Sequence, residues 1–285
     1  MDRVGSRFPT SAIDWAKAEL PDAWPDALNL ANPLVLARLF WKTRSAPARV
    51  VLPEGLTGAD RIPPYVLLEF HGLPNGNYSH SVTRGYARGF DALMLGTLEV
   101  ARRDLARRLA PAHRALDLGC GSGRMLRALQ QEGMDPVWGV DPSPYLLKVA
   151  AETAPGARLL QGVAESLELP DASVDAVSAC FVFHELPARV ADAALREARR
   201  VLVPGGRLGF VEPSPLQWWW GRWRLLRRFG PRGLYFRWVT RTVHEPFLES
   251  WHGRDPVAWL ERAGFRVDHH DCGCPLRVVT ATRLG

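Results

Sequence analysis

The residues with the clearest chemical pattern form a glycine-rich loop, Asp117-Leu118-Gly119-Cys120-Gly121-Ser122-Gly123-Arg124, directly after a short apolar run. Glycines in such a loop let the backbone turn tightly and approach a ligand, while the helix that follows presents free N–H groups. A loop of this kind after the first strand of an alternating strand and helix pattern is the usual place for a nucleotide-like ligand. We therefore expect a ligand site at Gly119, Gly121 and Gly123.

The spacing of the glycines argues against two common phosphate sites. A dinucleotide loop reads G-x-G-x-x-G, but the sixth position counted from Gly119 is Arg124, so the third glycine comes one residue early. A Walker-type loop ends in Gly-Lys-Ser/Thr, and this loop contains no lysine. Both NAD binding and ATP hydrolysis are therefore disfavoured.

Two acidic residues accompany the loop. Asp141 ends the next apolar run, where a carboxylate can accept hydrogen bonds from both ribose hydroxyls of an adenosine cofactor. Asp141 can also cap the helix that follows Pro142. Asp117 directly precedes the loop, so it either orients the loop towards a ligand or only stabilises the turn.

A histidine and a glutamate, His184 and Glu185, follow another apolar run that ends at Cys180. The carboxyl ends of parallel strands are where such sheets bind ligands, and histidine titrates near neutral pH, so this pair could remove a proton from a nucleophile. His184 could equally cap a helix or pack on a ligand. His71 and Tyr78 are second candidates for the same chemistry, with simple loop packing as their other interpretation.

The scaffold for these residues is predicted by short apolar runs that alternate with helix-length segments. The runs are 115–118, 137–140, 158–161, 174–180 and 207–211, and the helical segments are 125–131, 145–151 and 188–201. This alternation predicts an α/β fold with a doubly wound parallel sheet covered on both faces. Two last runs, 265–270 and 276–282, are joined by a short turn and predict an antiparallel hairpin at the sheet edge.

The chain divides into two regions. Residues 1–110 lack alternating strands and contain many prolines, which predicts a helical N-terminal cap that ends in one amphipathic helix over 86–109. Residues 111–285 form the domain that carries the motifs. Within this domain, residues 213–251 are here called the insertion. We expect them to be irregular in structure and to lie over the substrate. Part 216–241 of the insertion holds seven arginines, five of the 11 tryptophans and no acid.

In order along the chain, the motifs resemble those of class I S-adenosylmethionine-dependent methyltransferases, beginning with acidic-x-Gly-x-Gly-x-Gly at Asp117–Gly123. The later matches are Gly139-Val140-Asp141, Gly162–Pro170, Asp171–Val177 and Arg199–Leu208. The branch that they resemble is methyltransferase type 11, which includes ubiquinone and menaquinone C-methyltransferases. The resemblance implies a Rossmann-like, mostly parallel sheet of seven strands, with S-adenosylmethionine as cofactor and S-adenosylhomocysteine as product.

The resemblance also assigns residues to the cofactor. They are Asp117, Gly119, Cys120, Gly121, Gly123, Asp141, Pro142, Ala164, Glu165, Phe181 and Tyr86. In this family an Asp after the third strand commonly binds the adenine amino group, but Val163 stands at that position here. Adenine recognition is then expected from the Ala164 backbone, from Glu165 or from apolar contacts. Tyr86 reaches the cofactor from the cap or is a core aromatic.

Composition narrows the class of protein. With 285 residues, 47% hydrophobic and 23% charged, the chain is typical of a globular protein. Four unevenly spaced cysteines and the lack of a signal-peptide pattern predict a cytoplasmic location. The chain contains no uninterrupted run of 18 apolar residues, so no transmembrane segment is predicted. His269–Cys274 lacks the spacing of a zinc site and is expected to be a turn, so no metal is predicted.

The expected function is methyl transfer to an O, C or N atom of a small, largely apolar acceptor, such as a quinone-like or natural-product ring. His184, Glu185 and His71 are the predicted catalytic residues. One alternative is an RNA or DNA methyltransferase, which the pI of about 9.5 favours. Against it, Ile62 stands before Pro63-Pro64-Tyr65, where amino-group DNA methyltransferases carry a polar residue.

The other alternative is a lipid-surface binding protein with a vestigial cofactor site. For the tryptophans and arginines of the insertion, a substrate lid ranks first. Contact of Trp218–Arg241 with a membrane surface, peripheral to the cytoplasmic location, ranks second and a nucleic-acid platform third. Nucleic acid is not expected as a partner, and the pattern leaves the oligomeric state open.

Overall fold

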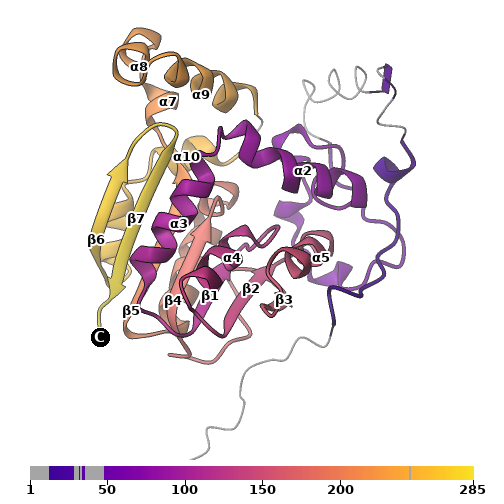
Figure 1. Cartoon of the computed structure of the whole chain (residues 1–285), viewed down its shortest axis with the longest axis horizontal. Coiled ribbons are helices and arrows are strands. Elements are labelled where there is room, and N and C mark those ends of the chain that lie inside the picture. Colours follow the sequence, from indigo (N-terminus) through magenta and orange to yellow (C-terminus); the bar gives the residue numbers. More distant parts are fainter. Residues whose placement is uncertain (1–12, 29–31, 33, 36–47, 244) are drawn as a thin grey trace, which may run out of the picture.

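A seven-stranded sheet forms the centre of the molecule (Figure 1). The computed structural model describes residues 13–28, 32, 34–35, 48–243 and 245–285. The strands are β1 (Ala115–Leu118), β2 (Val137–Asp141), β3 (Arg158–Gln161), β4 (Val174–Cys180), β5 (Leu202–Pro213), β6 (Phe265–Cys272) and β7 (Leu276–Arg283). Their order is β3-β2-β1-β4-β5-β7-β6, with β1 to β5 parallel and β7 antiparallel to both of its neighbours. The predicted mixed sheet with its C-terminal hairpin is confirmed.

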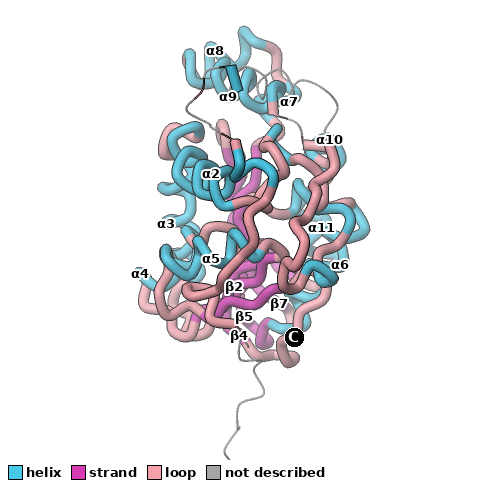
Figure 2. The backbone as a smooth tube through the Cα atoms, turned by 90° about the vertical axis from the view of Figure 1, so that its right-hand side faces the viewer, coloured by secondary structure: helices cyan, strands magenta, loops and turns pink. Residues whose placement is uncertain are grey.

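Helices cover both faces of this sheet (Figure 2). On one face lie α3 (Thr97–Leu109), α4 (Arg124–Gln131) and α5 (Pro144–Thr153), and on the other lie α6 (Ala188–Val201) and α11 (Pro256–Arg262). β1 and β2 are buried along their whole length, since a parallel sheet between two helix layers has no side open to water. Each face has its own apolar core, centred on Leu105 and Leu126 on one side and on Leu195 and Trp259 on the other.

The strand order places the chemistry-bearing segments together. β1 pairs with β2 on one side and with β4 on the other, so the direction of strand addition reverses at β1. The loops that leave β1 and β4 therefore flank a crevice at the carboxyl edge of the sheet, which is where open α/β sheets bind ligands.

The cap lies over this carboxyl edge. Of the predicted cap, residues 1–12, 29–31, 33 and 36–47 lie outside the described part, and the described residues before α2 (His80–Leu93) form short 3-10 turns. The single helix predicted over 86–109 is wrong, because Leu95 and Gly96 have φ of 50° and 69° and separate α2 from α3. α3 packs against β5 and β7 as part of the sheet layer, whereas α2 faces the crevice. The boundary near residue 110 stays a prediction.

The insertion is helical rather than irregular. Its helices are α7 (Leu216–Trp219), α8 (Arg222–Phe229), α9 (Pro231–Thr242) and α10 (Leu248–His252). Gly230, with φ of 64°, ends α8, and Pro231 begins α9 at the position where proline is favoured. In Figure 1, α7, α8 and α9 project together beyond the carboxyl edge of the sheet. The hydroxyl of Tyr235 donates to the Leu93 carbonyl at 2.8 Å and fastens α9 to α2.

Candidate functional site

The glycine loop after β1 adopts a shape that side chains would prevent. Gly119, Gly121 and Gly123 have φ of 57°, 50° and 80°, in the left-handed region that favours glycine. A Cβ atom on Gly123 would lie 2.9 Å from Cα of Ala150, so this glycine allows α4 and α5 to pack closely. A Cβ on Gly121 would meet no atom closer than 3.9 Å. Gly121 therefore faces open space in the crevice.

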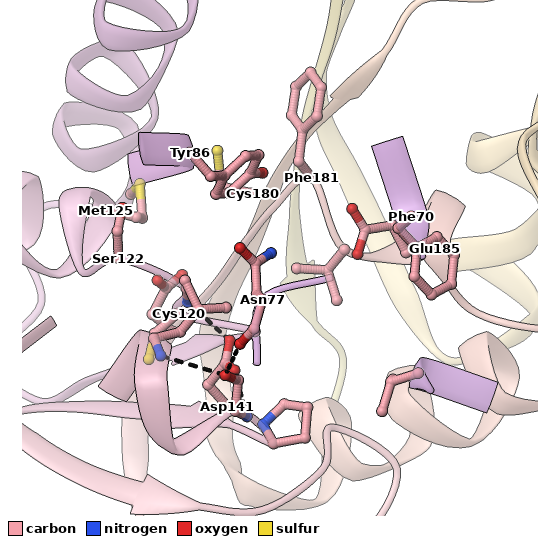
Figure 3. Close-up of a pocket in the computed structure, with 18 of the residues that line it drawn as sticks. Phe70, Asn77, Tyr86, Cys120, Ser122, Met125, Asp141, Cys180, Phe181 and Glu185 are labelled. Carbon is pink, nitrogen blue, oxygen red and sulfur yellow. Dashed lines mark hydrogen bonds between the residues drawn. The ribbon is translucent and has the colours of Figure 1, made fainter. Parts of the chain in front are cut away.

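Asp141 fixes the glycine loop by a hydrogen bond. Its carboxylate accepts the N–H of Gly121 at 2.9 Å and that of Ser143 at 2.8 Å (Figure 3). The Ser143 side chain is the N-cap of α5, so Asp141 is not the capping residue. Burial raises the pKa of Asp141 to about 6, although both N–H groups lower it. The carboxylate is thus a buried acceptor at the floor of the crevice.

Asp117 stands at the start of the loop and is also buried. Its carboxylate accepts the hydroxyl of Ser178 on β4 at 2.6 Å. Burial raises the pKa of Asp117 to about 7, against the effect of this hydrogen bond. Asp117 therefore joins β1 to β4 directly under the crevice.

Most of the predicted cofactor residues line one cleft between the sheet edge and the cap. Those that line it are Asp117, Gly119, Cys120, Gly121, Asp141, Pro142, Ala164, Phe181 and Tyr86. Gly123 lies behind the loop, and Glu165 accepts the Tyr65 hydroxyl at 2.5 Å instead of facing the cleft. Val163 lines the cleft beside Ala164, so apolar contact and the backbone are what this segment offers an adenine ring.

Hydrogen bonds at several points fasten the cap to the elements around the cleft. Ser143 Oγ donates to the Asn77 carbonyl at 2.6 Å, Gln161 Nε2 to the Gly58 carbonyl at 2.9 Å and the Arg124 guanidinium to the Ala87 carbonyl at 2.8 Å. They place Asn77, Phe70 and Tyr86 of the cap around the cleft, as Figure 3 shows. Asn77 and Phe70 had no sequence signal, since only the folded cap brings them here.

A buried carboxylate organises the segment after β4. Glu212, at the end of β5, accepts the N–H groups of Val182 and Phe183 at 3.0 and 2.8 Å. Nδ1 of His184 lies 2.6 Å from Oε2 of Glu212, and both side chains are fully buried. Because the carboxylate accepts at Nδ1, the other ring nitrogen, Nε2, faces away from Glu212.

Two glutamates and the cap histidine surround this outward nitrogen. His71 Nε2 lies 3.3 Å from Glu185 Oε1 and 3.3 Å from Glu245 Oε1. His184 Nε2 lies 3.7 Å from Glu245 Oε2 and 4.0 Å from Glu185 Oε1. His71, His184, Glu185, Glu212 and Glu245 together are called the histidine–glutamate cluster below.

The cluster has strongly coupled charges. Burial alone would lower the pKa of His71, but Glu245 and Glu185 hold it above its usual value. Against the same effect of burial, Glu212 and Glu245 hold the pKa of His184 well above its usual value. Burial favours the neutral form of Glu245, yet the two histidines hold its pKa far below the ordinary range.

Packing on both sides fixes the cluster. Phe183 stacks on Trp251 of α10 with ring centroids 5.7 Å apart and meets Trp259 edge to face at 5.1 Å. His71 stacks on Tyr86 at 5.7 Å and has a φ of 58°. Such strain in a residue other than glycine is typical of functional sites, because the surrounding structure must hold it.

Comparisons with known proteins agree with this architecture. Residues 116–210 match the family model described as a methyltransferase domain. An uncharacterized methyltransferase of Mycobacterium tuberculosis is 46% identical over 103 residues, which cover 36% of this chain and 40% of the relative. The ubiquinone/menaquinone biosynthesis C-methyltransferase UbiE of Acidiphilium cryptum is 32% identical over 163 residues, which cover 52% of this chain and 65% of the relative.

Residues 116–210 of this chain therefore form a methyltransferase domain. The chain spans less than half the length of the mycobacterial relative that it matches. A solved complex between the Haloferax volcanii Trm112 methyltransferase activator and a putative methyltransferase shares the fold. That match has a TM-score of 0.52 and 18% identity over 71% of this chain and 97% of that one. Within the described ranges, no helix has the length and apolarity needed to cross a membrane.

A second cavity of about 290 Å³ adjoins the cofactor cleft of the methyltransferase domain. Its walls are mostly apolar and come from α2 and α9, with Leu93, Phe236 and Val239 among them. His71, Tyr86 and Glu245 are the titratable groups among its lining residues. The two spaces share four lining residues, which are His71, Tyr86, Phe90 and Phe181. A ligand in the second cavity would therefore lie directly beside a ligand in the cleft.

The structure brings the three predicted catalytic residues together, although His71 is more than 100 positions from the other two. His71 and Glu185 line the cleft, whereas the fully buried His184 lines neither cavity and contacts them only through its neighbours. Glu212 and Glu245 were missed. The sequence feature that could have pointed to Glu212 is an acidic residue at the apolar end of a predicted strand. No such feature marks Glu245.

The raised pKa of Asp117 predicts how the stability of the protein changes with pH. The folded protein binds the Asp117 proton more tightly than the unfolded chain, so stability falls as pH rises from about 4 to about 7. We expect Asp117→Asn to raise the free energy of unfolding by roughly 1 to 3 kcal/mol at pH 8, with a smaller gain at pH 5. Urea denaturation at both pH values measures the difference.

Asp175→Asn is the control. Arg114 holds the pKa of Asp175 below its ordinary value, so its charged form stabilises the fold above pH 4. Its removal should lower stability by the same amount at pH 5 and pH 8. A loss of stability at pH 8 in Asp117→Asn would contradict the prediction.

Proposed function

We propose that this protein transfers a methyl group from S-adenosylmethionine to an O, C or N atom of a small, largely apolar acceptor, such as a quinone-like or natural-product ring. The observation that carries the proposal is the apolar cavity that shares a wall with the cofactor cleft. A preformed apolar space with a few convergent polar groups is the usual form of a small-molecule site.

The residues of the cleft fit the cofactor. Asp141, at the end of β2, offers a buried carboxylate to the ribose hydroxyls, and the backbone at Gly121 leaves room for the ligand beside it. Val163 and Ala164 offer the adenine ring an apolar wall. When bound, S-adenosylmethionine supplies a methyl group on a positively charged sulfur, and transfer breaks the S–CH3 bond and leaves the neutral thioether.

The acceptor's ring fits the apolar walls from α2 and α9, and its polar atom meets the histidine–glutamate cluster. Glu245 faces the acceptor cavity, Glu185 faces the cofactor cleft and His71 faces both. Methyl transfer depends mainly on in-line placement of the accepting atom, which the two rigidly packed walls provide. When that atom carries a proton, these side chains are the groups within reach to accept it.

Relatives named for quinone chemistry support an apolar ring as acceptor. Besides the UbiE protein of Acidiphilium cryptum, a demethylmenaquinone methyltransferase of Thermus thermophilus is 37% identical over 117 residues. Both alignments cover about half of this chain or less. They favour the class of acceptor rather than one molecule.

Cofactor binding can be tested with S-adenosylhomocysteine in calorimetry. We expect one site in the wild type and at least a 100-fold weaker affinity in Gly121→Arg, because the arginine would fill the cleft. Gly156→Arg is the matched control, since Gly156 also has a positive φ, of 84°, and open space around it but lies away from the cleft. If the wild type does not bind, the methyltransferase proposal fails.

The class of acceptor can be tested with methyl-labelled S-adenosylmethionine and an extract of the source cells. We expect the label in the organic phase after solvent partition, because an apolar cavity selects an apolar acceptor. Asp141→Ala, with its ribose contact removed, should lower the transferred label at least 10-fold. Label in the precipitated macromolecules would instead support a nucleic acid or protein as the acceptor.

The outer side of the insertion supports contact with a membrane surface. Trp219, Trp223 and Trp238 are 55%, 79% and 60% exposed. An open hollow on the same helices is lined by Trp220, Trp223, Arg224, Arg227 and Arg228. Exposed tryptophan with arginine suits the headgroup region of an anionic bilayer. Because α9 also forms a wall of the acceptor cavity, an acceptor dissolved in lipid would have a short path inward.

Co-sedimentation with anionic phosphatidylglycerol vesicles tests this surface. Each arginine contributes about 1 kcal/mol to such binding, so replacing Arg224, Arg227 and Arg228 with alanine should weaken it roughly 100-fold. Alanine replacements of Arg103, Arg107 and Arg266, which are exposed on α3 and β6, are the control. Equal loss in both triple variants would contradict the assignment. Salt-sensitive retention of RNA at physiological ionic strength would favour nucleic acid.

A further inference from the structure

We propose that His71, His184, Glu185 and Glu245 bind one divalent transition-metal ion where the cofactor cleft meets the acceptor cavity. The role of this ion in holding an acceptor rests on the proposed function, whereas its binding can be tested without it.

The spacing of the donor atoms is somewhat wider than that of a coordination shell. Four ligands at about 2.0 to 2.1 Å from a tetrahedral ion lie about 3.3 to 3.4 Å from one another. In the cluster, His71 Nε2 lies 3.3 Å from an oxygen of each neighbouring glutamate, and His184 Nε2 lies 3.7 and 4.0 Å from oxygens of the same two. Donor atoms of His71, His184 and Glu185 lie within 4.8 Å of one another. Glu245 adjoins this group of three, with one carboxylate oxygen near His71 and the other near His184. Binding of an ion would draw the three donors together and turn one Glu245 oxygen towards it.

The inward ring nitrogens lack hydrogen bonds. Nε2 of His184 and both ring nitrogens of His71 are buried and have no hydrogen-bond partner among the described residues. The glutamate oxygens come within ion-pair distance of these nitrogens but outside hydrogen-bond geometry. Buried polar groups in folded proteins almost always have a partner. A cation at the centre of the cluster would bind the two nitrogens and the two carboxylates together.

Glu212 completes the arrangement typical of a metal-binding histidine. Such a histidine donates its second ring N–H to a carboxylate, which fixes the tautomer and the ring orientation. His184 Nδ1 has this partner at 2.6 Å, and Glu212 is itself held by backbone N–H groups of residues 182 and 183. His184 Nε2 is therefore the free coordinating atom, and it points at the other donors.

The burial of the donors leaves one side open. His184, His71 and Glu245 have side chains 0%, 9% and 10% exposed, but Glu185 is 30% exposed. Figure 3 shows Glu185 at the wall of the cleft. The more exposed Glu185 side leaves an entry path to the ion, and catalytic zinc sites can expand from four to five ligands. A hydroxyl or enol oxygen of the acceptor would enter from this side as the fifth ligand, where the ion would lower its pKa.

The donor set favours some ions over others. Two imidazoles with two carboxylates suit Zn²⁺, Fe²⁺, Co²⁺ or Mn²⁺, whereas Mg²⁺ and Ca²⁺ prefer oxygen ligands alone. The sequence spacing predicted no metal, because the donors come from three separate segments: the cap, the loop after β4 and the end of the insertion.

Calorimetry of the chelator-treated full chain with Zn²⁺, together with Co²⁺ absorption spectra, tests the site. We expect one tightly bound Zn²⁺ and a visible Co²⁺ band of low coordination number. Zn²⁺ affinity should fall at least 10-fold in His71→Gln and in Glu245→Gln, whose side chains lie at the cavity walls. The double variant His269→Gln/His270→Gln on β6 controls for binding at surface histidines and should match the wild type.

Three results would overturn the inference: no binding at one equivalent, unchanged affinity in both cluster variants, or equal loss in the β6 control. Circular dichroism of each variant confirms folding, and Glu245→Gln provides a second route if His71→Gln does not fold. S-adenosylhomocysteine binding is measured on the same wild-type samples. Cofactor binding without the ion removes only the metal site, whereas the ion without cofactor binding removes only the proposed function.

Discussion

The candidate site depends on the hydrogen bonds that the buried Glu212 carboxylate accepts. This carboxylate is fully buried at the end of β5 and accepts backbone N–H groups from the segment after β4 as well as the ring of His184. Burying a polar group is costly unless it is hydrogen-bonded, and here two backbone N–H groups and the His184 ring satisfy the carboxylate. The contact sets the path of residues 181–185 and so decides where Phe181 and Glu185 enter the cleft. It also aims His184 Nε2 at two segments that are distant in sequence.

Those two segments close the site from opposite sides. The cap brings His71 in a strained backbone conformation, and the insertion brings Glu245 shortly before α10. Each is held by contacts away from the chemistry. The cap is held by hydrogen bonds to β3, α4 and the N-cap of α5, and the insertion by Tyr235 and the aromatic packing of Trp251. Strain at His71 can persist because these contacts over-determine its position. The same closure divides the space into the cleft over the glycine loop and the apolar cavity.

The insertion combines two surfaces in one element. The inner side of α9 lines the apolar cavity with Phe236 and Val239, while Trp238 on the same helix is exposed. Part of the arginine charge is paired with aromatic rings inside the insertion, as where Arg224 lies 3.7 Å from the centre of the Trp220 ring. Such pairing keeps the guanidinium groups at the surface beside the tryptophans. The arrangement links a surface suited to lipid with a cavity suited to an apolar ligand.

The sequence by itself determined the sheet and the position of the glycine loop and Asp141 at its carboxyl edge. Apolar periodicity, the glycine spacing and Asp141 at a strand end are local features, and the parallel sheet converts their order into neighbouring positions. The sequence did not predict the break between α2 and α3 at Leu95 and Gly96, the helices of the insertion, or the partners of His184. Only the tertiary structure decided those, because His71, Glu212 and Glu245 meet through packing between segments far apart in the chain. The spacing of residues within one segment cannot predict these contacts, since each segment is positioned by its own contacts with the sheet.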